Sequence, residues 1–158
     1  MEYISSADQK TLNARYQNTA LVGVALGASA GLYLVIGRVI SPPATTINDA
    51  QLKTLYYVLY SAAGVVSLAV VFLRRWLMGR LAAKTGVNAV LGGLGMASII
   101  GAALGEIVSI LGLVGYMVTG DAGYSWRLGV LGLALIMYSF PRRGEWARAV
   151  GNVAQEAQ

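Results

Sequence analysis

Glu106 is the one acidic side chain inside any of four long apolar segments of this sequence. On insertion scales a carboxylate at bilayer depth costs at least ~2.5 kcal/mol, so such a residue usually faces a partner group, a water-filled cavity or an ion path. No lysine or arginine lies at the same depth. We therefore expect one of two roles. Glu106 is either a polar anchor, bonded to a serine or tyrosine of a neighbouring helix or to a cation on another subunit, or a carrier of a proton or other cation.

The residue types that carry much of protein chemistry are missing, because the sequence has no cysteine and no histidine. Disulfides, thiolate metal sites, iron–sulfur clusters and imidazole ligation are thereby excluded, as is the commonest general base near neutral pH. An enzyme acting on lipid would need a convergent set of polar residues, whereas Asp49, Asp121 and Tyr124 are ordinary turn and cap residues. We expect no catalytic residue, no metal and no cofactor, and therefore not an enzyme.

The composition indicates a protein whose solvent is lipid. Hydrophobic residues make up 56% of the 158-residue chain and charged residues 12%, with a mean hydropathy of +0.61. A soluble domain carries about 25% charged residues, so half of the usual charge is missing. The sequence predicts an all-α, polytopic integral membrane protein.

The predicted transmembrane domain covers residues 19–140 and consists of four helices in a compact bundle. A cytoplasmic juxtamembrane helix is expected before it, over residues 1–18, and a cytoplasmic amphipathic tail after it, over residues 141–158. Proline has no amide hydrogen and disfavours helix for the residue before it, so Pro42 and Pro43 should end the first span. The four spans are predicted at residues 19–40, 52–73, 96–118 and 124–140.

The third apolar stretch, residues 87–118, is longer than a straight crossing of the bilayer requires. As one helix it would reach about 48 Å, against a hydrocarbon thickness of ~30 Å, so it must tilt, protrude or break. Glycine weakens helices, and Gly92, Gly93 and Gly95 are the expected weak point. Placing the membrane portion at residues 96–118 leaves Glu106 near mid-depth.

Basic residues divide unequally between the two sides of this topology. The N-terminal arm, the loop after the second span and the tail hold nine lysines and arginines, against Arg38, Lys53 and Arg127 on the other side. Positive loops stay inside, so both termini should be cytoplasmic. Topology and anionic lipid explain the formal charge of +5, and no nucleic-acid partner is needed. Contact with lipid headgroups or a partner is expected for Arg74, Arg75, Arg80, Lys84, Arg142 and Arg143.

Glycine spacing predicts how the helices pack. Gly23, Gly27 and Gly31 recur every fourth residue, and Gly101 and Gly105 repeat the spacing beside Glu106. Such faces let helix backbones approach closely in lipid, where no hydrophobic force drives helices together. Packing inside this bundle and packing against other subunits are both open.

The tail places Trp146, Val150 and Val153 on one face of a helix. This pattern is typical of a helix that lies in the membrane interface or docks on a partner, and a frayed terminus is the alternative.

A faint internal repeat appears when the chain is shifted by about 70 residues, as parallel repeats in membrane proteins can show. Asn18 and Gly23 then fall on Asn88 and Gly93. The repeat suggests two tandem helical hairpins, although glycine-rich apolar segments also align by chance.

The run around Glu106 resembles a known family, the c-subunit (proteolipid) of rotary ATP synthases. Glu106, Ile110 and Gly112-Leu113-Val114 stand where that family's ion-carrying helix has its acidic residue, its isoleucine and its Gly-Leu-Val. The resemblance implies that Glu106 binds and releases a proton or sodium ion, and that the preceding basic loop faces the cytoplasm.

Two functions follow from these features. The first is a non-catalytic membrane subunit that packs through glycine-rich helix faces into a larger complex, with unlike subunits favoured over identical ones. The alternative is a proteolipid-like oligomer that translocates protons or cations through Glu106. Short loops and an uncleaved start are typical of a bacterial or archaeal cytoplasmic membrane.

Overall fold

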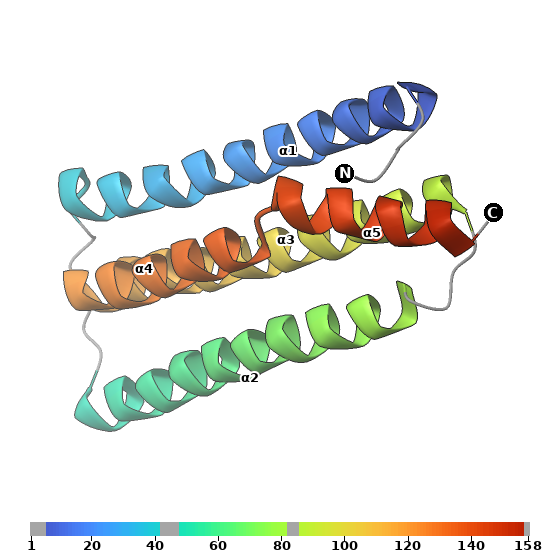
Figure 1. Cartoon of the computed structure of the whole chain (residues 1–158). Coiled ribbons are helices and arrows are strands. Elements are labelled where there is room, and N and C mark those ends of the chain that lie inside the picture. The colour runs from blue at the N-terminus through green and yellow to red at the C-terminus, as the bar shows by residue number, and fades with distance from the viewer. Residues whose placement is uncertain (1–5, 42–47, 82–85, 157–158) are drawn as a thin grey trace.

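The computed structural model describes residues 6–41, 48–81 and 86–156, and their secondary structure is entirely helical (Figure 1). The prediction of an all-α fold is confirmed. The helices of these segments are α1 (Ser6–Val39), α2 (Asp49–Leu81), α3 (Val87–Thr119), α4 (Ala122–Ser139) and α5 (Arg143–Glu156).

Three of these helices, α1, α2 and α3, are long and apolar enough to cross a membrane. They contain 34, 33 and 33 residues, so each is about 50 Å long and exceeds a hydrocarbon thickness of ~30 Å by several turns. The expected juxtamembrane helix and first span are one continuous helix, α1. Helix α4 has 18 residues, and does not reach the hydropathy of the other three.

The helices form three layers (Figure 1). The antiparallel pair α3 and α4 lies in the middle, with α1 on one flank and α2 on the other. Within the described residues α1 and α2 do not contact each other. They therefore do not form a packed hairpin, and the expected pair of tandem hairpins is wrong in this respect. The bundle is flatter and more open than the compact one we expected.

Glycines hold the central pair together at backbone distance. A Cβ atom placed on Gly105 would lie 2.9 Å from the carbonyl oxygen of Gly132, and one on Gly112 would lie 2.9 Å from the Cβ atom of Leu128. Ser109 adds a hydrogen bond across the contact, from its hydroxyl to the carbonyl oxygen of Gly129 at 3.4 Å. We call this contact the α3–α4 seam.

The predicted glycine faces divide into packed and open positions. Gly101 and Gly105 both face α4, where they lie against Ser139 and Ile136. On α1, a Cβ atom on Gly23 would meet the Phe140 ring at 3.1 Å, and one on Gly27 would meet Ile136 at 3.9 Å. A Cβ atom placed on the third position, Gly31, would have no neighbour within 4 Å in the described part of the chain. The α1 stripe is therefore packed at one end and open at the other.

Of the three outcomes left open for the long third stretch, tilt, protrusion and a break, the structure excludes the break, because α3 continues through Gly92, Gly93 and Gly95. A Cβ atom on Gly95 would lie 3.2 Å from the Thr19 hydroxyl and 3.8 Å from Trp146. Packing against α1 and α5 thus supports a segment whose intrinsic helix propensity is weak. As one continuous helix, α3 must tilt or protrude if it crosses a bilayer.

A hydrophobic cluster joins α5 to the first parts of α1 and α3. Helix α5 buries Trp146 and Val150 against Leu12 of α1 and Leu91 of α3, and Tyr16 meets the Trp146 ring edge to face at 5.8 Å. We expected the apolar face of the tail to lie in the membrane interface or to dock on a partner. In the structure, the chain itself covers this face. After the helix breaks between Ser139 and Arg143, α5 continues in the direction of α4 along the first half of α3 (Figure 1), which brings that face onto the first turns of α1 and α3.

Substitution by alanine should distinguish packed from open glycines. Gly105→Ala forces a methyl group against backbone atoms, and we expect it to lower the free energy of unfolding by about 1–3 kcal/mol. Gly31→Ala is the matched control, expected to be neutral or to stabilise by up to about 1 kcal/mol, because the site is open and alanine favours helix. Titration of the detergent-solubilised protein with dodecyl sulfate, followed by circular dichroism, measures both. Equal effects at the two positions would contradict the seam.

Candidate functional site

The Glu106 carboxylate accepts hydrogen bonds from two hydroxyl groups of α1. The Ser29 hydroxyl donates to Oε1 of Glu106 at 2.6 Å, and the Tyr33 hydroxyl donates to the same oxygen at 3.2 Å. The two hydroxyl oxygens are 2.9 Å apart. The predicted serine or tyrosine partner is confirmed, and α1 supplies both.

Helical spacing and small side chains bring these groups together. Ser29 and Tyr33 are one helical turn apart on α1, so they share a face. Beside them Ala30 is fully buried in a small cluster with Ala102 of α3 and Ile136 of α4. Because alanines form the contact, α1 comes close enough to α3 for its hydroxyls to reach Glu106. All three members of the polar site are partly buried.

This arrangement holds one carboxylate and two neutral hydroxyls, with no cation among the contacts that the structure gives to them. Hydroxyl donors stabilise a carboxylate that has lost its water. The same three oxygens would also accept a proton or a bare cation. The geometry therefore accommodates both roles expected for Glu106.

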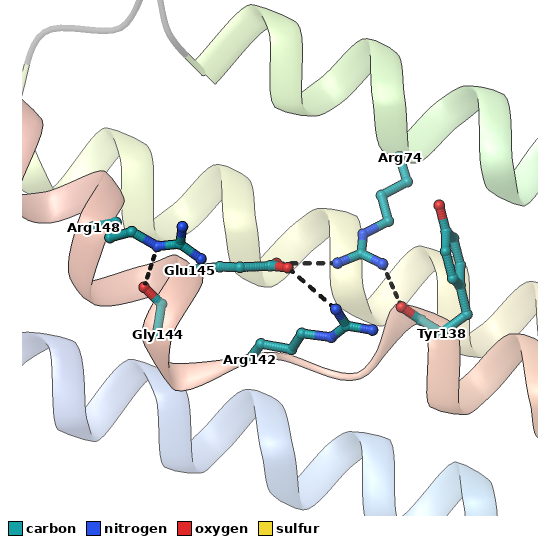
Figure 2. Close-up of polar contacts among 6 residues, drawn as sticks. All are labelled: Arg74, Tyr138, Arg142, Gly144, Glu145 and Arg148. Atoms are coloured by element: carbon teal, nitrogen blue, oxygen red, sulfur yellow. Dashed lines mark hydrogen bonds and ion pairs between the residues drawn. The ribbon is translucent and has the colours of Figure 1, made fainter.

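Arg74 belongs to a polar cluster that joins α2 to the corner between α4 and α5 (Figure 2). Its guanidinium lies 3.1 Å from the Glu145 carboxylate, donates to the carbonyl oxygen of Tyr138, and lies 4.6 Å above the Tyr138 ring. Arg142 lies near the other oxygen of the same carboxylate, with its Nη1 atom 3.7 Å from Oε1 of Glu145. The structure gives Arg74 partners within its own chain, and the contact with lipid headgroups or a partner that we expected for it stays a prediction.

The four other predicted basic residues that the structure describes, Arg75, Arg80, Arg142 and Arg143, are exposed. The Arg80 guanidinium lies 4.1 Å above the Trp76 ring, and Arg143 donates to Asn13 of α1 at 3.3 Å. Lys84 lies outside the described residues. These side chains remain candidates for contact with lipid headgroups.

Aromatic residues mark the opposite end of the bundle. The rings of Tyr56 and Tyr60 on α2 lie 4.4 Å apart, and Tyr60 meets Tyr124 of α4 at 6.0 Å. Arg38 lies 5.4 Å above the Trp126 ring. Tyrosine and tryptophan concentrate where membrane meets water, so this cluster has the composition of an interfacial belt.

Comparison of the chain with models of known protein families, with curated proteins and with solved structures finds no match. The resemblance of the Glu106 run to the c-subunit family therefore stays a prediction.

Removing the Arg74 side chain should loosen α2. Arg74→Ala deletes a partly exposed ion pair, a hydrogen bond to a carbonyl oxygen and a cation–π contact, and we expect a loss of about 1–2 kcal/mol of unfolding free energy. Arg75→Ala, an exposed neighbour with the same charge, should change stability by less than about 0.5 kcal/mol. Unfolding in dodecyl sulfate measures both variants. A loss at Arg74 no larger than that at Arg75 would show that the cluster does not hold α2.

Proposed function

We propose that this chain is a four-span protein of a bacterial or archaeal cytoplasmic membrane, with both termini in the cytoplasm, that serves as a non-catalytic subunit of a larger membrane complex. Charge supports this orientation. The start of α1, the end of α2 and the end of α5 lie at one end of the molecule (Figure 1). Arg74, Arg75 and Arg80 belong to the last third of α2, which leads to this end. Short positive segments stay on the cytoplasmic side.

Helix α4 supplies the fourth crossing in this proposal. Its 18 residues span about 27 Å, close to the hydrocarbon thickness of ~30 Å. Its lower hydropathy is acceptable because the α3–α4 seam removes one of its faces from lipid. Leu128, Leu135 and Ile136 are buried there with Gly129 and Gly132.

The observation that carries the subunit role is the open outer flank of α1 and α2. Helix α2 buries Leu59, Ala63 and Val70 on a single stripe, whereas Val65 and Leu68 are 67% and 72% exposed. A methyl group placed on Gly64 would meet nothing within 4 Å.

A glycine in a helix lowers stability unless another helix uses the space that its missing side chain leaves. A glycine inside a helix costs about 1 kcal/mol relative to alanine. At Gly31 and Gly64 no neighbour within the described part of the chain uses the space that the missing side chain leaves. A helix of another subunit that approaches closely would use it. Two flanks with such positions favour unlike neighbours on the two sides over a single symmetric contact.

Filling the open glycines tests this role. A tagged chain purified from native membranes in mild detergent should carry unlike membrane proteins with it, and Gly31→Leu or Gly64→Leu should each remove a partner. Stability should be unchanged, because both sites are open within the chain. Val130→Leu, an exposed change on α4, is the matched control. Isolation of the wild-type chain as a lone monomer would refute the subunit role.

A second function, translocation of protons or cations by an oligomer, is favoured by the oxygen cluster at Glu106. Ser29, Tyr33 and Glu106 place three oxygens within hydrogen-bonding distance in the middle part of two long apolar helices. Ion pathways through membranes use ionisable residues that face such polar neighbours.

Glu106→Gln separates the two functions, because glutamine keeps a hydrogen-bond acceptor for Ser29 but cannot gain or lose a proton. If Glu106 carries ions, the variant assembles normally and proteoliposomes lose proton or sodium flux. If Glu106 is an anchor, wild type and variant show the same background flux, whereas Glu106→Ala and Ser29→Ala weaken assembly. Flux that survives in Glu106→Gln would contradict translocation through this carboxyl group.

A further inference from the structure

A groove of about 530 Å³ runs between α1 and the first half of α3. The two helices are parallel here, with Thr19 beside Gly95. Gly92 and Gly95 both line the groove on the α3 side, and a Cβ atom placed on Gly92 would have no neighbour within 4 Å, so the wall is open there. The glycine triplet that does not break α3 thus borders a concave surface.

The groove changes from polar to apolar along its length. Arg15 and Asn18 line it toward the start of α1, and Val22, Met96 and Ile99 line it farther along. Met96 and Ile99 are 62% and 38% exposed, so this end opens on the apolar outside of the bundle. A ligand that fits both ends must itself have one charged end and one apolar end.

The groove lies at the level where the apolar part of the bundle ends. Gly23, one position beyond Val22, faces the ring of Phe140, which directly follows α4. Arg15 is eight residues earlier on α1, about 12 Å nearer the polar end. In the proposed topology this is the cytoplasmic headgroup region, about 5–8 Å thick, which an arginine side chain can reach along the helix surface.

We propose that this groove binds an anionic phospholipid. Its phosphate binds the Arg15 guanidinium, and a phosphate or glycerol oxygen accepts a hydrogen bond from the Asn18 amide. The first part of one acyl chain lies along Val22, Met96 and Ile99. The choice of occupant follows from charge and depth. Guanidinium groups form charge-assisted hydrogen bonds with phosphate. The apolar end faces acyl chains in any membrane-spanning orientation, and this inference depends on the proposed topology but not on the partner subunits.

Native mass spectrometry of the protein, after exchange into detergent with phosphatidylglycerol or phosphatidylcholine of the same acyl composition, tests the site. We expect one retained lipid with a preference for phosphatidylglycerol. Arg15→Gln should weaken phosphatidylglycerol retention roughly tenfold, as expected for one charge-assisted hydrogen bond. Lys10→Gln, an exposed change of equal charge on α1 outside the groove, is the matched control and should retain the lipid.

Gly92→Leu is a second, independent variant, because a Cβ atom at Gly92 meets nothing within 4 Å and its side chain would enter the groove without disturbing the fold. We expect it to lose both lipids while its unfolding in dodecyl sulfate is unchanged. Three results would each overturn the proposal. The first is equal lipid retention by Arg15→Gln and Lys10→Gln, and the second is lipid that stays bound to Gly92→Leu. The third is a wild-type protein that forms a lipid-free dimer, if Gly92→Leu dissociates that dimer. Co-purification of unlike subunits tests the proposed function separately.

Discussion

The close contact between α3 and α4 is the constraint on which the rest of this structure depends. Helices in lipid gain little from burying apolar surface, so they associate where their backbones can approach. Gly105 and Gly132 allow that approach, and Ser109 adds a hydrogen bond across it. A methyl group at Gly105 or Gly112 would collide with backbone or Cβ atoms of α4, so these positions tolerate no side chain without a shift. The seam thus makes α3 and α4 the central layer of the fold.

With that layer in place, α1 and α2 can pack only on its two flanks. Small residues on α1, among them Ala30, bring the Ser29 and Tyr33 hydroxyls to Glu106, so the costly carboxylate is satisfied within the chain. The same arrangement leaves the outer faces of α1 and α2 apolar and unpacked, with open glycines at Gly31 and Gly64. The subunit role that we propose and the polar site are therefore two consequences of one packing order.

The polar end of the molecule has its own organisation. Beyond the apolar part of the bundle, Trp146 and Val150 of α5 pack with Leu12 and Leu91, and Arg74 ties α2 to Glu145. The protruding turns of three long helices thereby acquire a small core and an ion pair. The groove between α1 and α3 lies at the border between this core and the apolar region, where a phospholipid has its charged and apolar parts.

The sequence by itself determined the features that depend on local composition: the helical class, the long apolar helices, the division of basic residues between two ends, and the need of Glu106 for a polar or charged partner. It did not reveal that Gly112 and Gly132 line the seam or that Gly129 faces Leu34 of α1, because glycine spacing does not say which helix face meets which. Only the tertiary structure decided that α3 continues through its glycines, that α5 covers its own apolar face, that Arg74 bonds within the chain and that α1 and α2 stay apart. Each of these depends on contacts between segments distant in the chain, which local periodicity and propensity do not encode.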